Sequence, residues 1–328
     1  MGYNKQNYKR IREEYATKTF RAQGEADERR QELYGEIPGL KALDDRLFSF
    51  GLRIMQAALQ SENTGAQIEA LHRENEEIKR LRGEMLRKNG FPEDYDLPKY
   101  ECEACKDTGY VGIKMCNCMR RSLIEAGMES SGLSALMQVQ SFENFSTDYY
   151  RADPKSHQTM CELYQKVRSY AYGFSLENGN KPQSLLFLGG TGLGKTHLST
   201  AVARVVIERG YDVYYNSAVG MISDFEYRRF GNGLVQNEGD DVERYTDCDL
   251  QILDDLGTEV VNQFTISCLY HVINTRLNLK KPTVISTNLL SGELRKLYGD
   301  RIASRLLGEF MVYPFYGVDV RKQKLMNQ

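Results

Sequence analysis

The stretch Gly189-Gly190-Thr191-Gly192-Leu193-Gly194-Lys195-Thr196 matches the pattern G-x-x-x-x-G-K-[ST]. The apolar run at 184–188 (SLLFL) predicts a buried strand before it, and residues 195–209 predict a helix after it. A glycine loop in this setting turns backbone N–H groups and a helix N-terminus toward an anion. In such loops Lys195 would reach the β- and γ-phosphates, and the Thr196 hydroxyl would bind Mg²⁺. The stretch therefore predicts a nucleoside triphosphate site; the alternative is a glycine-rich turn that matches by chance.

Composition excludes several classes of protein. The chain has 328 residues, 41% of them hydrophobic, which suffices for a packed core and favours two domains. No stretch approaches the roughly 18 apolar residues that a membrane span needs. Residues 1–10 (MGYNKQNYKR) lack the apolar core of a signal peptide, so a cytoplasmic protein with no membrane partner is expected. With a net charge of −2, any contact with nucleic acid must come from a local basic patch.

The C-terminal half alternates between strand and helix patterns. Strands are predicted at 184–188, 211–216, 249–254, 283–287 and 310–316, and helices at 195–209, 217–230, 262–279 and 291–307. Alternation of this kind predicts an α/β fold with a parallel sheet and helices on both faces. Such sheets bind ligands at the carboxyl ends of their strands, where the glycine loop falls.

The rest of the chain divides into three further segments. Residues 1–98 are highly charged and helical in pattern, 99–121 form a compact cysteine module, and 122–183 connect that module to the core at 184–328. Leu71, Ile78 and Met85 recur every seven residues in the first segment, but for fewer heptads than a coiled coil requires. The interpretation stays open between a small helical bundle and a short coiled coil.

Two carboxylates end an apolar strand of the core. Leu250–Leu253 leads into Asp254 and Asp255, and the next predicted strand ends at Asn288. Asp254 suits Mg²⁺ coordination through water, Asp255 suits polarising an attacking water, and Asn288 suits orienting that water. The alternative for the carboxylate pair is a solvated strand end.

Three arginines follow. Arg301 and Arg305 lie four apart in the segment 299–305 (GDRIASR), which places them on one helix face, and Arg321 comes directly after the last predicted strand. Arginine stabilises negative charge on a transferring phosphoryl group and is often supplied by a neighbouring subunit. A helix whose arginines pair with surface acids is the alternative for the first two.

Together these motifs resemble an AAA+ ATPase, and more narrowly the DnaC/DnaI helicase loaders and their relative IstB, a transposition ATPase. The narrower resemblance rests on Phe142-Glu143-Asn144-Phe145, on Asp254-Asp255-Leu256-Gly257 and on Gly317-x-Asp319-x-Arg321, and it covers roughly 140–328. It implies that Arg305 is an arginine finger, with Arg301 as its interface companion and Arg321 as the sensor-2 arginine. It also implies that Phe142 and Phe145 pack near the adenine and that the core lacks a C-terminal helical lid.

The resemblance further implies the partners. Residues 1–98 would bind a hexameric replicative helicase of the DnaB type, while the core binds ATP and Mg²⁺ and assembles into a nucleotide-dependent oligomer. Two other functions remain open: an IstB-like ATPase that assembles on duplex DNA to direct a transposase, and a P-loop kinase for a small molecule. The late paired arginines and the second carboxylate, Asp255, argue against the kinase.

The cysteine module has the spacing of a metal site. Cys102-x-x-Cys105 and Cys116-x-Cys118 present four thiolates on two short turns, which can close a tetrahedral Zn²⁺ site of structural type. A redox-active C-x-x-C and an iron–sulfur cluster are the alternatives, although no thioredoxin-like pattern surrounds the pair.

A candidate surface for single-stranded DNA lies on the predicted helix at 217–230. Its segment 225–230 (FEYRRF) interleaves aromatic side chains with cations, among them Tyr227, Arg228 and Arg229. The alternative is an amphipathic helix with both phenylalanines buried and both arginines solvated. The resemblance favours the DNA-binding interpretation.

Overall fold

The computed structural model describes residues 3–60, 64–176, 182–230 and 241–326. The chain forms two compact units. The first consists of Met1–Ile11 together with Met119–Gln328, and the second of Arg12–Cys118. The first residues of the chain thus belong to the same unit as the core, and the cysteine module belongs with the N-terminal helices.

A parallel sheet forms the centre of the first unit. Its strands are β3 (Leu185–Leu188), β4 (Val213–Ser217), β5 (Leu250–Leu256), β6 (Thr283–Thr287) and β7 (Met311–Pro314). Their order is β4-β5-β6-β3-β7, and every neighbouring pair is parallel. The α/β fold expected from the alternating sequence pattern is confirmed. Strand β6 lies between β5 and β3, so three strand ends with polar residues meet at one edge.

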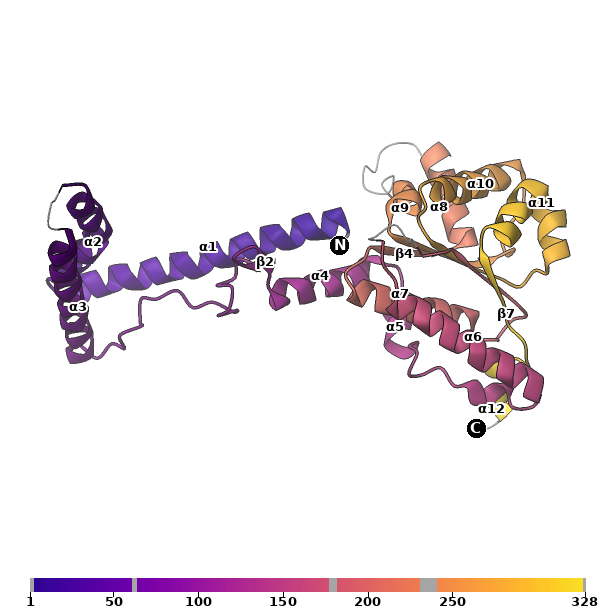
Figure 1. The fold of residues 1–328 in the computed structure, drawn as a ribbon, viewed down its shortest axis with the longest axis horizontal. Coiled ribbons are helices and arrows are strands. Elements are labelled where there is room, and N and C mark those ends of the chain that lie inside the picture. The colour runs from indigo at the N-terminus through magenta and orange to yellow at the C-terminus, as the bar shows by residue number, and fades with distance from the viewer. Residues whose placement is uncertain (1–2, 61–63, 177–181, 231–240, 327–328) are drawn as a thin grey trace. The chain divides into compact units, whose positions relative to one another are not determined.

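Helices cover both faces of the sheet (Figure 1). On one face lie α5 (Ser134–Val139), α6 (Pro154–Tyr172) and α7 (Lys195–Glu208); on the other lie α8 (Ala218–Phe230), α9 (Asp241–Asp247), α10 (Gln263–Asn278) and α11 (Ser291–Gly308). Because side chains alternate along a strand, Leu185 and Phe187 of β3 pack on the α7 side, and Leu186 and Leu188 on the α8 side. All four are buried, as expected for a parallel sheet covered on both faces.

Two local irregularities interrupt the regular elements of the core. The pairing of β5 with β6 shifts between Leu253 and Leu256, and Asp255 has a positive φ of 53°. A bulge of this kind redirects the side chains at a strand end. Helix α11 is interrupted at Gly299, whose φ of 76° and ψ of 169° are not helical, so the segment with Arg301 and Arg305 begins a new helical stretch.

The second unit is a small helical bundle with the cysteine module. It contains most of α1 (Lys5–Glu36), together with α2 (Leu40–Gln60), α3 (Thr64–Lys88) and the hairpin of β1 (Tyr110–Val111) and β2 (Lys114–Met115). Leu33, Ile37, Leu40 and Leu86 form its small apolar core. This packing matches the small bundle that the sequence left open against a coiled coil.

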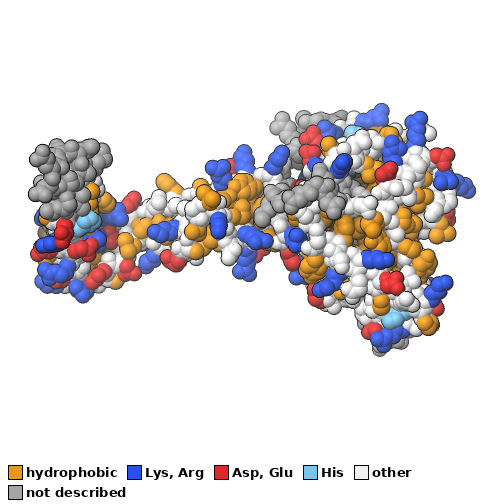
Figure 2. Space-filling model, viewed as in Figure 1, with side chains coloured by type: hydrophobic (Ala, Val, Ile, Leu, Met, Phe, Trp, Pro, Cys, Tyr) orange, Lys and Arg blue, Asp and Glu red, His pale blue; other side chains and the backbone are white. Residues whose placement is uncertain are grey.

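Buried charges add specificity to this bundle. Arg82 of α3 pairs with Asp44 of α2 at 2.6 Å and with Asp96 at 2.5 Å, and Arg30 of α1 reaches Asp96 at 3.2 Å. Breaking one member of such a network would leave a buried charge without its partner, so we expect the network to define how the helices fit together. Figure 2 shows positive and negative side chains interspersed over α2 and α3. None of the helices in the described ranges is long and apolar enough to span a membrane.

Candidate functional site

The glycine loop at 189–196 joins β3 to α7 in a conformation that requires glycine. Gly192 and Gly194 have φ values of 71° and 86°, and Gly194 is the N-cap of α7. A Cβ atom on Gly194 would lie 2.8 Å from the ring of Phe145, and one on Gly192 would collide with Asp319. The first N–H groups of a helix have no partner within the helix. Loop and helix start therefore form a cradle that suits phosphate groups.

Lys195 links the loop to the neighbouring strand end. Its ammonium donates hydrogen bonds to the carbonyl oxygens of Gly189 and Gly190, both at 2.7 Å, and to Oδ1 of Asn288 at 2.6 Å. Burial lowers the pKa of Lys195, while the carboxylates of Asp255 and Asp254 oppose this shift. The position of β6 beside β3 brings Asn288 to the glycine loop.

Asp254 is the most highly bonded carboxylate at the site. Only 2% of its surface is exposed, and its Oδ2 accepts hydrogen bonds from Thr196 at 2.8 Å and from the Tyr215 hydroxyl at 3.1 Å. Ser286 donates to its other oxygen. Mg²⁺ prefers oxygen ligands and keeps several waters, so the adjacent Thr196 hydroxyl and Asp254 carboxylate fit this ion.

Asp255 follows in the bulge and faces the cavity. Its backbone N–H donates to Oγ of Ser286 at 3.0 Å, and its side chain belongs to the cavity lining. Burial raises the pKa of Asp255, and the charge of Asp254 raises it further, against the opposing effects of Lys195 and Arg321. A carboxyl group with a raised pKa in a cavity is a candidate for accepting a proton from water.

A cavity of 340 Å³ lies over the loop. Its lining combines residues of the glycine loop with the segment before α6, the end of β6 and the start of α12 (Val320–Met326): Leu136, Gln140, Asn144, Phe145, Ser146, Tyr149, Tyr150, Thr191, Gly192, Leu193, Gly194, Lys195, Thr196, His197, Asp255, Asn288, Val320 and Arg321. A volume of this size suits a small-molecule ligand. All of these residues belong to the first unit.

Aromatic side chains form one wall of the cavity. Phe145 stacks on Tyr164 with ring centroids 5.6 Å apart. It also meets the ring of His197 in a T-shaped arrangement with ring centroids 5.3 Å apart. Tyr150 donates a hydrogen bond to the carbonyl of Leu193 at 2.8 Å, which ties this wall to the loop. A planar base can pack against such a surface.

The two phenylalanines expected near the adenine lie in different environments. Phe145 lines the cavity, whereas Phe142 is 2% exposed, lies in the apolar core and is not part of the lining. Its carbonyl accepts a hydrogen bond from Tyr164 at 3.1 Å, so Phe142 supports the wall from beneath. Of the two phenylalanines expected to pack near the adenine, Phe145 lines the cavity and Phe142 lies behind it.

The three arginines occupy two different places. Arg321, at the start of α12, lines the cavity, and Val320 before it donates its N–H to the carbonyl of Gly192 at 3.0 Å. Arg301 is exposed, and Arg305 lies over the ring of Tyr270 at 4.7 Å. Neither belongs to the described lining of the cavity, so within one chain only Arg321 faces it.

The sequence interpretation missed several residues of the site. Tyr215 falls inside the strand predicted at 211–216, and its place near the carboxyl end of a parallel strand was a usable signal. Tyr149 and Tyr150 carried no such signal, because they approach the loop only through tertiary folding.

The four cysteines of the second unit form one cluster. The sulfurs of Cys102, Cys105, Cys116 and Cys118 lie within 4.8 Å of one another, with Cys102 and Cys116 3.8 Å apart and Cys105 and Cys118 3.4 Å apart. Four Zn–S bonds of about 2.3 Å in a tetrahedron place the sulfurs about 3.8 Å apart. Asp107 braces the first turn by accepting the N–H of Cys102 at 2.8 Å. The geometry fits a structural Zn²⁺ ion.

The candidate DNA surface on α8 is exposed. Tyr227, Arg228 and Arg229 all lie at the surface, and Phe230 is 69% exposed, contrary to the alternative in which both phenylalanines are buried. Arg229 lies over the rings of Phe230 and Phe264, at 5.2 Å from each centroid. Arg228 forms an ion pair with Glu243 at 3.3 Å.

The glycine loop, the bonded carboxylate and the sheet order define a P-loop ATP-binding protein of the AAA+ class. A family model described as IstB-like ATP binding protein matches residues 133–322. This match covers more than half of the chain, which belongs to the family of IstB-like ATP-binding proteins.

Several known proteins are similar to the core. The replicative helicase loader DnaC of Escherichia coli (strain K12) is 26% identical over 178 residues, which are 54% of this chain and 66% of that protein. The chromosomal replication initiator protein DnaA of Aliarcobacter butzleri (strain RM4018) is 33% identical over 139 residues, 41% of this chain and 31% of that protein. The chain thus spans less than two thirds of the length of either relative.

Two further proteins match this chain over a larger share of their own length. The phage-like element PBSX protein XkdC of Bacillus subtilis (strain 168) is 24% identical over 228 residues, 65% of this chain and 80% of that protein. A crystal structure of the DnaC helicase loader aligns with 53% of this chain and 98% of its own, at 22% identity and a TM-score of 0.43.

Proposed function

We propose that the protein is an ATP-dependent loader of a hexameric replicative DNA helicase. The observation that carries this proposal is the nucleotide site formed by residues 189–196, 254–255 and 288, within a core similar to the helicase loader DnaC. The second unit lies outside the family match at 133–322, and we assign contact with the helicase to its helices.

The site is suited to hydrolysis of ATP to ADP and phosphate. Lys195 would neutralise the terminal phosphates, while Thr196 and Asp254 would hold Mg²⁺, which neutralises charge as the bond to the γ-phosphate breaks. Asn288 would orient the attacking water, and Asp255 would accept its proton, for which its raised pKa is suited. Arg321, which lines the cavity, would approach the γ-phosphate from the same chain.

The remaining arginines support self-assembly. Arg301 and Arg305 lie outside the described lining of their own cavity, although arginine at this step stabilises the transferring phosphoryl group. We assign Arg305 to the cavity of a neighbouring subunit, with Arg301 at the interface between the two. Hydrolysis would then depend on assembly of the oligomer.

Single-stranded DNA is the proposed template for that assembly. Tyr227, Phe230 and the stacked Arg229 offer aromatic faces and cations on one exposed helix, which are the two requirements for binding a single strand without base readout. Arg228 would contribute charge beside them.

The test is capture of the cognate replicative helicase by the full chain, with ATP, with ADP and without nucleotide. We expect capture that changes with nucleotide and that Lys195→Ala makes insensitive to ATP. Failure to capture the helicase in every nucleotide state would contradict the loader function, whatever the rate of hydrolysis.

The family match favours one other candidate, an IstB-like ATPase that directs a transposase on duplex DNA. It predicts ATP-dependent filaments on duplex DNA and no capture of a helicase. Electron microscopy with duplex and single-stranded DNA in parallel separates the two functions.

A further inference from the structure

The turn at 130–132 binds the outer edge of the sheet. It joins α4 (Asn117–Ser130) to α5 and lies beside β4, the edge strand of the sheet. The N–H of Tyr215 donates to the carbonyl of Ser131 at 2.9 Å. Gly132 has a φ of 81°, and a Cβ atom there would lie 2.9 Å from the carbonyl oxygen of Tyr215. The turn is therefore seated closely on the backbone of Tyr215.

The side chain of the same tyrosine reaches the metal-binding carboxylate. The Tyr215 hydroxyl donates to Oδ2 of Asp254 at 3.1 Å, and this oxygen also accepts from Thr196. One residue thus connects the turn to the proposed Mg²⁺ ligand.

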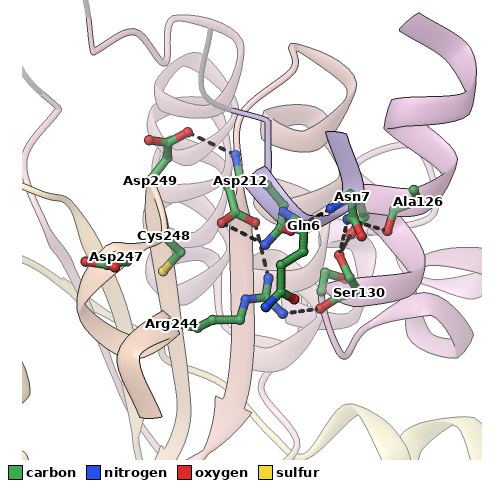
Figure 3. A network of polar contacts seen from close by, with 12 residues as sticks. Gln6, Asn7, Ala126, Ser130, Asp212, Arg244, Asp247, Cys248 and Asp249 are labelled. Atoms are coloured by element: carbon green, nitrogen blue, oxygen red, sulfur yellow. Dashed lines mark hydrogen bonds and ion pairs between the residues drawn. The ribbon is translucent and has the colours of Figure 1, made fainter. Parts of the chain in front are cut away.

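The turn is also bonded to the first turn of α1 (Figure 3). Asn7 donates from its amide to Oγ of Ser130 at 2.7 Å and to the carbonyl of Ala126 at 3.1 Å. Arg244 of α9 donates to the carbonyl of Ser130 at 2.8 Å and pairs with Asp212 at 3.2 Å. Two elements distant in sequence therefore converge on the turn next to Tyr215.

We propose that Tyr215 is a positioning residue for Asp254, and that the contact between Asn7 and the turn at 130–132 tunes the affinity of the nucleotide site for Mg²⁺. The proposal rests on the proposed function in one respect, because the site must bind ATP with Mg²⁺. Residues of α1 beyond Ile11 continue into the unit assigned to the helicase. A partner that displaces the start of α1 would then change Mg²⁺ binding without touching the nucleotide.

Tyr215→Phe tests the first step, since it removes only the hydroxyl. The readout is the Mg²⁺ concentration that gives half-maximal binding of a fluorescent ATP analogue to the full chain, with binding in EDTA as reference. We expect this concentration to rise about 10-fold, as for loss of other groups that orient a metal ligand, and binding in EDTA to stay unchanged. Tyr211→Phe is the matched control, because Tyr211 precedes β4 and packs on Phe174.

An unchanged Mg²⁺ requirement in Tyr215→Phe, or an equal rise in Tyr211→Phe, would overturn the positioning role. The wild-type chain separates this failure from that of the proposed function. If it binds no ATP at any Mg²⁺ concentration, the proposed function is wrong; if it binds ATP and only the Tyr215→Phe shift is missing, only this inference is wrong.

Asn7→Ala tests the link to α1, with the exposed neighbour Gln6→Ala as control. We expect a smaller rise in the Mg²⁺ requirement than for Tyr215→Phe, and no additional rise when the two changes are combined, because the effect passes through Tyr215. Ser130→Ala removes the acceptor of the hydrogen bond from Asn7 to Ser130. This variant is used in place of Asn7→Ala should Asn7→Ala fail to fold. No rise in either variant, or full additivity with Tyr215→Phe, would overturn the link.

Discussion

The hydroxyl of Thr196 donates a hydrogen bond of 2.8 Å to the carboxylate of Asp254, 58 residues later in the chain. The contact reaches across the end of β6, because β6 lies between β5, which contains Asp254, and β3, which leads into the loop of Thr196. It holds the hydroxyl at the start of α7 beside the carboxylate that we propose as a Mg²⁺ ligand.

Thr196→Val should separate metal binding from phosphate binding. Valine has a similar shape but no hydroxyl, so Mg²⁺-dependent binding of ATP should weaken by at least about 10-fold. Binding in EDTA should stay close to wild type. Lys195→Ala is the comparison, because loss of the ammonium should weaken binding under both conditions. Titration with a fluorescent ATP analogue gives both values, and an equal loss in EDTA for Thr196→Val would contradict the assignment.

Asp255→Asn should change stability in a pH-dependent way. The folded-state pKa of Asp255 is raised above the ordinary value of 3.8, so the wild type loses stability as pH rises from that value through the folded pKa. The uncharged asparagine escapes this loss. Thermal unfolding without nucleotide should show the variant to be more stable at neutral pH, with the difference vanishing in acid; Asp45→Asn at an exposed position should show no such trend.

The same variant should also lose hydrolysis by roughly 100-fold or more while it still binds ATP, because proton acceptance contributes at this scale. Phosphate release and nucleotide binding measured side by side test this. Hydrolysis at the wild-type rate would exclude Asp255 as the proton acceptor.

Arg305→Ala mixed with Lys195→Ala should recover activity that neither variant has alone. In a mixed oligomer, an intact Arg305 can face an intact glycine loop on the adjacent subunit, which restores part of the hydrolysis. Arg305→Ala also loses its contact with Tyr270, so circular dichroism should establish that the variant is folded. No recovery at any mixing ratio would contradict action in trans.

Cys105→Ser should abolish the metal site of the second unit. We expect the wild type to release about one Zn²⁺ per chain to a chromogenic chelator when its thiols are blocked, and Cys105→Ser to contain almost none. Cys161→Ser, which alters a half-buried cysteine outside the cluster, should retain the metal. A visible absorption spectrum typical of iron would favour the iron–sulfur alternative instead.

Phe230→Leu should weaken binding to single-stranded DNA while preserving an apolar side chain at this position. Loss of one aromatic stacking surface costs about 1–3 kcal/mol per base. Arg229→Ala should weaken binding and reduce its dependence on salt, since it removes a cation. Arg295→Ala on α11 controls for general charge, and fluorescence anisotropy with labelled oligonucleotides measures all three.

The regular helices and strands of the core could be predicted because their hydrophobic residues follow a clear pattern along the sequence. The apolar runs that become β3 and β6 are buried on both faces, and α7, α10 and α11 span several turns, so a sequence pattern is sufficient to find them. The seven-residue helices α9 and α12 were missed, because two turns contain too few residues to show a period.

The polar site could be predicted only in part, for a different reason. Asp254 and Asp255 lie near the carboxyl end of β5 and Asn288 follows β6, and parallel strands bring such residues to one edge. Phe142 and Phe145 differ in a way that spacing does not show, since the chain between them turns and buries one ring while it leaves the other at the cavity. The turn at 130–132 carries no motif; its role comes from a sheet edge formed by a distant strand.

The contact between Val320 and Gly192 has a consequence for biosynthesis. Strand β7 and the start of α12 complete the surroundings of a loop that emerges from the ribosome more than a hundred residues earlier. A nascent chain that ends before residue 321 contains the phosphate-binding motif but not the finished pocket. We therefore expect ATP to stabilise the core most once these late residues have folded onto it, which places full nucleotide binding late in the maturation of the protein.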